Sequence, residues 1–218
     1  MAEVLTQNQQ TLLRVFGSSK LSQHFYLTGG TALSTFYLQH RFSEDLDFIT
    51  NEKQNVELLR KQIVEVLSPM SKNLNFIRSL ETFIELHITL NDGEIIKMDF
   101  AYDTPFHLKE RVLNSDYGIR IESLLDIGCN KISTVFDRAD AKDFVDLYFL
   151  LTEHFTFEEL WEHAKQKHVG LDEYWFCQAL MRVVQLSRLP RMIKPLTLEE
   201  LQIFFKMLHS SILAKISN

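Results

Sequence analysis

The sequence has few cysteines and lacks the long apolar runs of membrane-spanning proteins. Its 218 residues include two cysteines, Cys129 and Cys177, which are far apart and form no C-x-x-C pair. We therefore expect two buried thiols in a reducing compartment. The apolar run "FVDLYFLL" is far too short to cross a bilayer, and "MAEVLTQNQQTLLRVF" lacks the pattern of a signal peptide. These absences predict a soluble cytoplasmic protein with no membrane partner.

Positive charge is also scarce. Lys and Arg number 23 against 29 Asp and Glu, which gives a formal net charge of −6. This balance argues against a surface that binds nucleic acid unselectively, but it does not exclude a local basic groove. Apolar residues make up 45% of the chain, enough to bury a core, and the length allows one large domain or two small ones.

Hydrophobic periodicity divides the chain into two parts. The first part mixes apolar runs typical of strands with amphipathic helices, and after about residue 121 only helical patterns remain. We predict an α+β fold, with a mixed β-sheet flanked by helices in residues 1–117 and an all-α helical bundle in residues 118–218. The expected strands are 24–28, 45–50, 83–90 and 94–102, the last two joined at "NDG". The expected helices are 2–16, 30–40, 53–68, 121–137, 141–153, 156–168, 171–185 and 197–216.

Carboxylates mark two of the expected strands. Asp45 and Asp47 in "SEDLDF" are two residues apart and should share one strand face, where their charges repel. Asp99 lies in "IIKMDFA", an apolar strand where a carboxylate is out of place. If these strands are neighbours, three carboxylates meet and can hold Mg²⁺. The alternatives are a solvated pair at a strand end, and an edge-strand Asp99 paired with Lys97.

Gly29 and Gly30 stand between an expected strand and an expected helix. Backbone N–H groups at such a place can receive a phosphate, and Thr28, Thr31 or Ser34 could add a hydroxyl. A simple tight turn is the alternative, because neither the P-loop pattern nor G-x-G-x-x-G is present.

A second group of charged residues lies in the helical part. Lys131 and Arg138 fall on one helix face, and Asp143 and Asp146 share a face at i, i+3. A solvated helix face with ordinary ion pairs is the alternative for the two basic residues. Arg41 is predicted mainly to stabilise neighbouring aspartates, and no histidine has metal-ligand spacing.

In combination, "GGTALS…HRFSEDLDF", "KMDF" and "NKISTVFDRADAKDFVDLYFL" resemble the AbiEii/AbiGii-type nucleotidyltransferases. These are toxins of type IV toxin–antitoxin systems in the DNA polymerase β-like nucleotidyltransferase superfamily. The resemblance covers about residues 25 to 150. It implies a nucleotidyltransferase-like sheet and a bacterial, metal-dependent enzyme that moves an NMP group from an NTP to an acceptor, with release of pyrophosphate.

The resemblance also implies roles for individual residues. Asp45, Asp47 and Asp99 would bind Mg²⁺ or Mn²⁺, and together with Lys131 they would be the catalytic residues. The nucleotide-binding residues would be Gly29, Gly30, Thr31, Lys131, Asp143 and Asp146.

The acceptor implied is RNA such as tRNA, or a protein hydroxyl, and a cognate antitoxin is an implied partner. Two other functions stay open. One is a catalytically inactive nucleotide-binding or protein-interaction module of the same fold. The other is a metal-dependent phosphohydrolase or glycosyltransferase that uses D-x-D.

Overall fold

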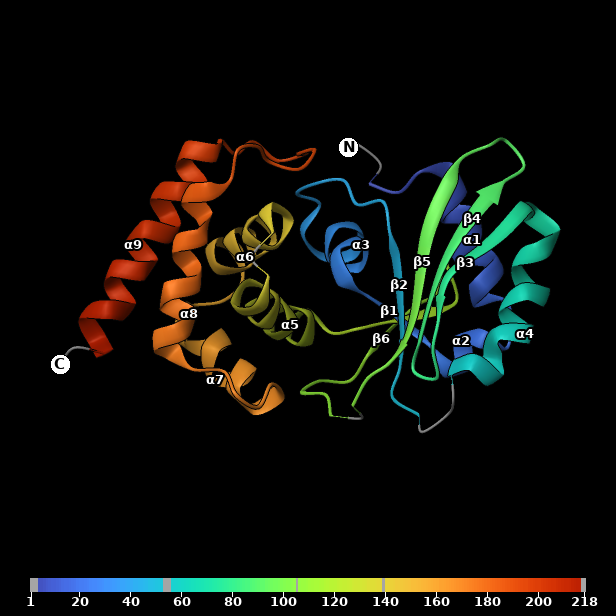
Figure 1. Ribbon diagram of the computed structural model, residues 1–218, viewed down its shortest axis with the longest axis horizontal. Coiled ribbons are helices and arrows are strands. Elements are labelled where there is room, and N and C mark those ends of the chain that lie inside the picture. The colour runs from blue at the N-terminus through green and yellow to red at the C-terminus, as the bar shows by residue number, and fades with distance from the viewer. Residues whose placement is uncertain (1–3, 53–55, 105, 139, 217–218) are drawn as a thin grey trace. The chain divides into compact units, whose positions relative to one another are not determined.

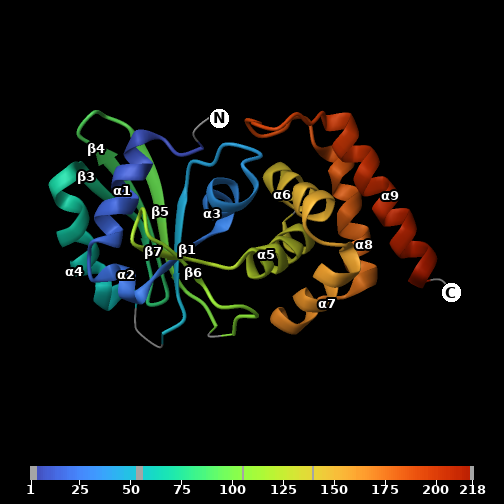
Figure 2. The same cartoon turned by 180° about the vertical axis from the view of Figure 1, so that it is seen from behind.

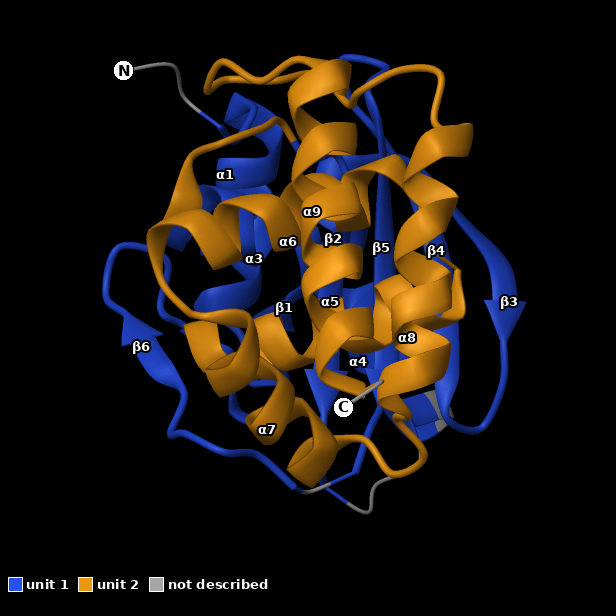
Figure 3. Ribbon diagram, turned by 90° about the vertical axis from the view of Figure 1, so that its left-hand side faces the viewer, with its two compact units in different colours: residues 1–37, 43–123 blue, residues 38–42, 124–218 orange. Residues whose placement is uncertain are grey.

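The protein forms two compact units in a computed structural model that describes residues 4–52, 56–104, 106–138 and 140–216. Unit 1 comprises residues 1–37 and 43–123, and unit 2 comprises residues 38–42 and 124–218 (Figure 3). The segment 38–42 thus belongs to the helical unit although it lies early in the sequence. That residues 1–117 and 118–218 are separate domains stays a prediction.

Unit 1 is built on a mixed sheet, which among the described residues has seven strands in the order β3-β4-β5-β2-β1-β7-β6 (Figures 1 and 2). β2 pairs with β5 in parallel and β1 pairs with β7 in parallel, while the other neighbours are antiparallel. The predicted mixed sheet is therefore confirmed. The strands are β1 (Tyr26–Thr28), β2 (Leu46–Thr50), β3 (Ser71–Ser79), β4 (Phe83–Leu90), β5 (Ile95–Tyr102), β6 (Val112–Asn114) and β7 (Ile119–Ile121).

Helices lie on both faces of this sheet. Those of unit 1 are α1 (Gln7–Gly17), α2 (Leu21–His24), α3 (Gly29–Leu33) and α4 (Val56–Leu67). α1, α2 and α4 are on one side of the strands and α3 is on the other (Figure 1). A Thr6 capping box begins α1. The turn of helix Ser34–Leu38 that follows α3 has π geometry.

Aromatic residues form the centre of the core between α1 and the sheet. The ring of Phe16 from α1 stacks on Phe48 of β2 at 4.1 Å and lies 6.1 Å from the ring of Phe100 of β5. All three side chains are fully buried. Because side chains alternate along a strand, Asp47 and Asp99 are directed to the opposite face from Phe48 and Phe100.

The differences from the sequence prediction have local causes. β3 was not expected because most of its side chains are polar and exposed, as is common at a sheet edge. β6 and β7 have three residues each, too few for a periodic signal. The helix expected over 30–40 changes to π geometry at Ser34 and ends at Leu38, before Gln39, which has φ 51°. The expected residues 53–55 of the next helix lie outside the described part of the chain.

The main elements of unit 2 are all helices, which confirms the predicted all-α bundle. It contains α5 (Leu124–Asp137), α6 (Ala141–Glu153), α7 (Phe157–Lys167), α8 (Glu173–Leu180) and α9 (Leu198–Ile216). Thr156 begins α7 with a capping box, and Thr197 makes the same hydrogen bonds with Glu200 before α9. Segment 38–42 is attached to the loop before α9, since the backbone N–H of Ile193 donates to the carbonyl of His40 at 2.8 Å.

Two other sequence predictions can be compared with the structure. Cys129 and Cys177 are both buried and neither forms a disulfide, as expected. In the part of the chain that the structure describes, we find no helix with the length and apolar character that a membrane span requires.

The Phe16 cluster gives a prediction for stability. Phe16→Ala should lower the free energy of unfolding by about 3–5 kcal/mol, because it removes a fully buried ring and leaves a cavity. Urea denaturation measures this loss. Phe106→Ala, at a side chain that is 49% exposed, is the matched control and should change stability far less. Equal losses in the two variants would contradict the assignment of Phe16 to the core centre.

Candidate active site

Three carboxylates lie together on the sheet face opposite the Phe16 cluster. The parallel register of β2 and β5 pairs Asp47 with Asp99, and the antiparallel register of β4 and β5 pairs Asp99 with Glu85. Asp47, Asp99 and Glu85 therefore form a row across three adjacent strands. Asp45 is one residue before β2, rather than within a strand as the sequence predicted. The neighbouring strands of Asp47 and Asp99 agree with the sequence prediction.

Among the described residues, two cations lie at this row: Arg78, whose Nε is 3.5 Å from Oε2 of Glu85, and Lys97. The Nζ of Lys97 lies 2.7 Å from Oδ2 of Asp99, and the side chains of these two residues are 33% and 16% exposed. Burial lowers the pKa of Lys97, but the ion pair with Asp99 and the charges of Asp45 and Asp47 raise it overall above its ordinary value. Burial, with the charges of Glu85 and Asp45, raises the pKa of Asp99 although Lys97 opposes this. The pairing expected in the alternative for Asp99 thus exists, but β5 is an inner strand and not an edge.

The Gly29–Gly30 turn touches this row directly. Gly29 has φ +72°, a conformation that L residues rarely adopt, and a Cβ there would overlap the carboxylate of Asp47, whose Cγ would be 2.9 Å away. Glycine is therefore required both by the backbone and by the close approach of Asp47. The Gly29–Gly30 turn thus packs directly against the carboxylate of Asp47.

Hydroxyl groups fix the turn in place. Thr31 donates a hydrogen bond to the backbone carbonyl of Asp45, and Thr28 donates to the buried carboxylate of Glu122. Thr28 makes no side-chain cap on α3. Ser34 is buried, and its Oγ has no hydrogen-bond partner. The hydroxyls of Thr28 and Thr31 thus position the turn. Glu122 is a residue that sequence reasoning missed, because a single acid after a three-residue strand carries no motif.

The loop before β2 is held by a side chain from α1. Nε2 of Gln9 donates to the carbonyls of Ser43 and Glu44 at 3.1 and 3.0 Å. Gln9 is itself 1% exposed. Asp45 is therefore placed by hydrogen bonds to its loop rather than by strand pairing, which explains why period-two reasoning extended β2 one residue too far.

The residues of the row match a hard divalent cation in chemistry. Across the described ranges of the chain, no three His, Cys, Asp or Glu side chains are close enough together to hold a metal ion as they stand. Yet Asp99 Oδ1 is buried without a hydrogen-bond partner, and carboxylate oxygens are the ligands that Mg²⁺ prefers. The buried Oδ1 of Asp99, next to Asp47 on the neighbouring strand and without a hydrogen-bond partner, fits the role of a cation ligand.

The other predicted site residues form a network inside unit 2. Nζ of Lys131 lies 3.1 Å from Asp143 Oδ1 and 2.8 Å from Asp146 Oδ2. Arg41 binds Asp146 through Nε and Nη2 at 2.6 and 2.8 Å, and Arg138 binds Asp143 at 2.9 Å. Lys131 and both aspartates are buried, so Lys131 does not form the solvated pairs of the alternative interpretation. Arg138 is 52% exposed and also lies 3.6 Å from Asp140, as that alternative expected. Arg41 was expected to stabilise the neighbouring Asp45 and Asp47, but the carboxylate it binds with two nitrogens is that of Asp146.

The network keeps its carboxylates ionised. Burial would raise the pKa of Asp146, but Lys131 and Arg41 hold it well below its ordinary value. His40, which has no metal-ligand spacing in the sequence, is fully buried and donates from Nε2 to Asp146 Oδ1 at 2.7 Å. Burial is the main reason that the pKa of His40 falls below 6.5. Removing Lys131 would leave each buried aspartate with one arginine partner in place of two cations.

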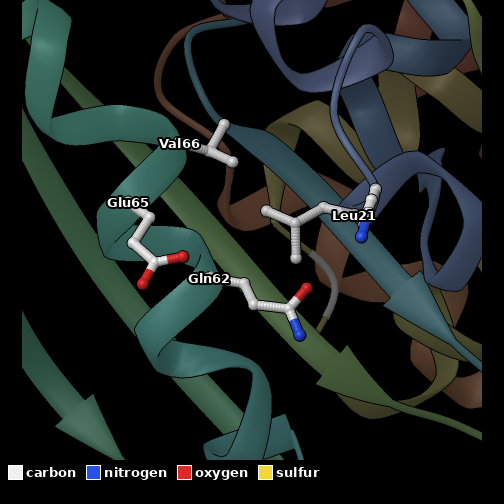
Figure 4. A pocket seen from close by; sticks show the side chains of 5 residues that line it. Leu21, Gln62, Glu65 and Val66 are labelled. Atoms are coloured by element: carbon white, nitrogen blue, oxygen red, sulfur yellow. The ribbon is translucent and has the colours of Figure 1, made fainter.

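Unit 1 also has a pocket whose lining contains none of the three carboxylates Asp47, Asp99 and Glu85. It lies between the start of α2 and one side of α4 (Figure 4). Its lining residues are Lys20, Leu21, Gln62, Glu65 and Val66. With one carboxylate and one amine among them, these residues offer no arrangement for group transfer.

The Gly29 turn gives a second prediction. Gly29→Ala should destabilise the protein by about 1–2 kcal/mol from backbone strain and by roughly a further 1–3 kcal/mol from overlap with Asp47. Gly93→Ala is the matched control, because Gly93 has φ +97° with open space around its Cβ position. Urea unfolding of both variants isolates the overlap as their difference. If Gly29→Ala costs no more than Gly93→Ala, the close packing against Asp47 is wrong.

The His40 contact gives a third prediction, on pH. A histidine whose folded pKa is lowered binds fewer protons than the unfolded chain, so stability is present above pH 6.5 and falls below it. The slope attributable to His40 should be up to about 1.4 kcal/mol per pH unit. In His40→Gln, whose amide N–H can still donate to Asp146, that slope should disappear between about pH 6.5 and 5.

Denaturation at a series of pH values measures these slopes. Between about pH 7 and 8 the two proteins should give parallel curves, since His40 is neutral there in both the folded and unfolded chain. Identical slopes in wild type and His40→Gln below pH 6.5 would show that His40 is not held neutral by its burial.

Comparison with known proteins places these features in a family. The family model described as "Nucleotidyl transferase AbiEii toxin, Type IV TA system" matches residues 10–215. An uncharacterized protein of Aquifex aeolicus is 34% identical over 170 residues, which cover 77% of this chain and 78% of that protein.

Two solved structures have a similar fold. A candidate nucleotidyltransferase from H. pylori matches with a TM-score of 0.61 and 21% identity over 95% of this chain and 97% of that one. MenT4, a nucleotidyltransferase toxin from Mycobacterium tuberculosis, matches with a TM-score of 0.57 and 16% identity over 94% and 81%. The predicted nucleotidyltransferase-like fold is confirmed. Since the family model spans nearly the whole sequence, this chain belongs to the AbiEii nucleotidyl transferase family.

Proposed function

We propose that this chain transfers a nucleoside monophosphate from an NTP to an acceptor hydroxyl and releases pyrophosphate. The observation that carries the proposal is the β2–β5 register, which sets Asp47 beside Asp99 at the Gly29 turn. In the reaction, the acceptor oxygen forms a bond to the α-phosphorus and the bond from that phosphorus to the bridging oxygen breaks. Asp99 would accept the hydroxyl proton, since burial raises its pKa.

Asp45, Asp47 and Asp99 are the residues that would hold Mg²⁺ or Mn²⁺ as cofactor. The bound cation would neutralise charge on the phosphates during transfer. The unpartnered Oδ1 of Asp99 supports this assignment. The residues themselves orient one another: Gly29 lets the Asp47 carboxylate approach the turn, and Thr31 fixes the backbone of Asp45.

The triphosphate would bind at Gly29, Gly30 and Thr31. The Gly29–Gly30 turn joins the end of β1 to the start of α3 and lies against the carboxylate of Asp47. The predicted nucleotide-binding role of Lys131, Asp143 and Asp146 stays a prediction. It would require Nζ of Lys131 to exchange a carboxylate partner for a phosphate, since both aspartates now bind it.

The biological setting follows from family membership by inference. We infer a toxin of a type IV toxin–antitoxin-like system in the bacterial cytoplasm, with a cognate antitoxin as a partner. RNA, such as a tRNA, or a protein hydroxyl is the inferred acceptor. The formal charge of −6 favours a limited nucleic-acid footprint over an extended one.

An inactive nucleotide-binding module of the same fold is the second candidate. The observation that favours it is the Lys97–Asp99 ion pair, in which an amine stands where a metal would compete for the same oxygen. This candidate predicts NTP binding without turnover. A phosphohydrolase or D-x-D glycosyltransferase would release phosphate or a nucleoside diphosphate in place of pyrophosphate.

A labelling experiment tests the proposal and gives the fourth prediction. Purified protein with Mg²⁺ is incubated with each α-³²P-labelled NTP and with total RNA or lysate. We expect label in one class of macromolecule and an equal amount of pyrophosphate. Asp47→Asn and Asp99→Asn should each reduce transfer by roughly a hundredfold or more, since each removes a charged oxygen ligand.

Asp116→Asn, at an exposed turn residue of unit 1, is the control and should retain activity. NTP binding without label transfer in any mixture would favour the inactive module. Transfer that survives both active-site substitutions would contradict the placement of the site.

A further inference from the structure

We propose that Lys97 is a built-in counter-ion of the carboxylate row, which holds Asp99 in the metal-free protein and has to be displaced when a divalent cation binds. The inference rests on the proposed metal site and adds a residue to it. Lys97 is a positioning residue in this proposal, because it acts through Asp99.

The geometry supports a direct competition. Nζ of Lys97 lies 2.7 Å from Asp99 Oδ2, while Asp99 Oδ1 is buried and has no partner. One oxygen of the carboxylate thus binds the amine, and the other has no hydrogen-bond partner. A cation that takes both oxygens, or that moves Asp99 toward Asp47 on the neighbouring strand, has to weaken the contact with Lys97.

The surroundings explain why a lysine is needed there. Asp45 and Asp47 also act on Lys97, and Glu85 acts on Asp99 from β4. Without a cation, this half-buried concentration of carboxylates would repel itself and favour protonation of one member. Arg78 on β3 compensates Glu85, with its Nε 3.5 Å from Oε2. Lys97 is two residues from Asp99 on the same strand face and compensates Asp99.

Lysine has properties that suit displacement. Its ammonium is a compact charge on a flexible stem, and its side chain is 33% exposed here. The amine can therefore leave Asp99 for solvent or for an anionic group without unfolding the strand. Lys131 differs in this respect, because it is buried between two carboxylates.

Direct metal binding tests the inference without relying on activity. The free Mn²⁺ signal in electron paramagnetic resonance is titrated with wild type and with Lys97→Met, which keeps the apolar stem and removes the charge. We expect Lys97→Met to bind Mn²⁺ roughly tenfold more tightly, because a competing and repelling charge is gone. Without metal its melting temperature should fall, and Mn²⁺ should raise that temperature more than in wild type.

Lys61→Met is the matched control. Lys61 is in the same unit, on α4, and its side chain is 88% exposed, so this change removes the same charge away from the row. Its Mn²⁺ affinity should stay within about twofold of wild type. If Lys97→Met does not fold, Lys97→Gln replaces it in the same titration, with the same expected direction.

The outcomes separate this inference from the proposed function. Tighter binding in the Lys97 variant, including binding seen in that variant but not in wild type, supports the counter-ion role. Equal or weaker binding in the variant, with normal binding in wild type, overturns the role of Lys97 and leaves the metal site standing. Absence of Mn²⁺ binding in both proteins overturns the inference together with the metal site on which it rests.

Discussion

The parallel pairing of β2 with β5 is the constraint on which the candidate site depends. It sets Asp47 level with Asp99, and because side chains alternate along each strand, it also sets Phe48 level with Phe100 on the other face. A shift of one residue in either strand would exchange acids for rings on both faces. Burial of Phe48 and Phe100 against Phe16 thus fixes the register that places the two carboxylates together.

The two units handle buried charge in different ways. In unit 2, Lys131, Arg41 and Arg138 satisfy two fully buried aspartates, and His40 completes the hydrogen bonds. In unit 1, Asp99 is only partly satisfied by Lys97, and one of its oxygens lacks a partner. Both places contain a buried atom without a hydrogen-bond partner, Nδ1 of His40 in unit 2 and Oδ1 of Asp99 in unit 1. Only the atom of Asp99 is a carboxylate oxygen, the ligand that a hard cation prefers, and this chemistry is the reason for proposing the active site at the carboxylate row.

Family membership and geometry contribute different parts of the functional conclusion. The family model over residues 10–215 identifies the chain as an AbiEii nucleotidyl transferase, and the solved structures support the fold at low identity. Neither the family model nor the solved structures assign a role to an individual residue of this chain. The assignment of Asp45, Asp47 and Asp99 rests on the register, the Gly29 turn and the unpartnered oxygen, and it is open to the tests described for each.

The sequence by itself determined most of the helices, the apolar strands β1, β2, β4 and β5, and the presence of acids on two of those strands, but not β3, β6 and β7 or the position of Asp45 before β2. The period-two pattern of "FIELHITL" places Ile84, Leu86, Ile88 and Leu90 on one strand face, and in the structure all four are buried. "KMDF" predicted an acid on an apolar strand, and the structure shows that this strand is an inner one. Only the tertiary structure decided that Lys97 binds Asp99, that Thr28 binds Glu122, and that segment 38–42 joins the helical unit with His40 against Asp146. These contacts join residues whose partners depend on rotamers and chain packing, and local periodicity carries no information about either.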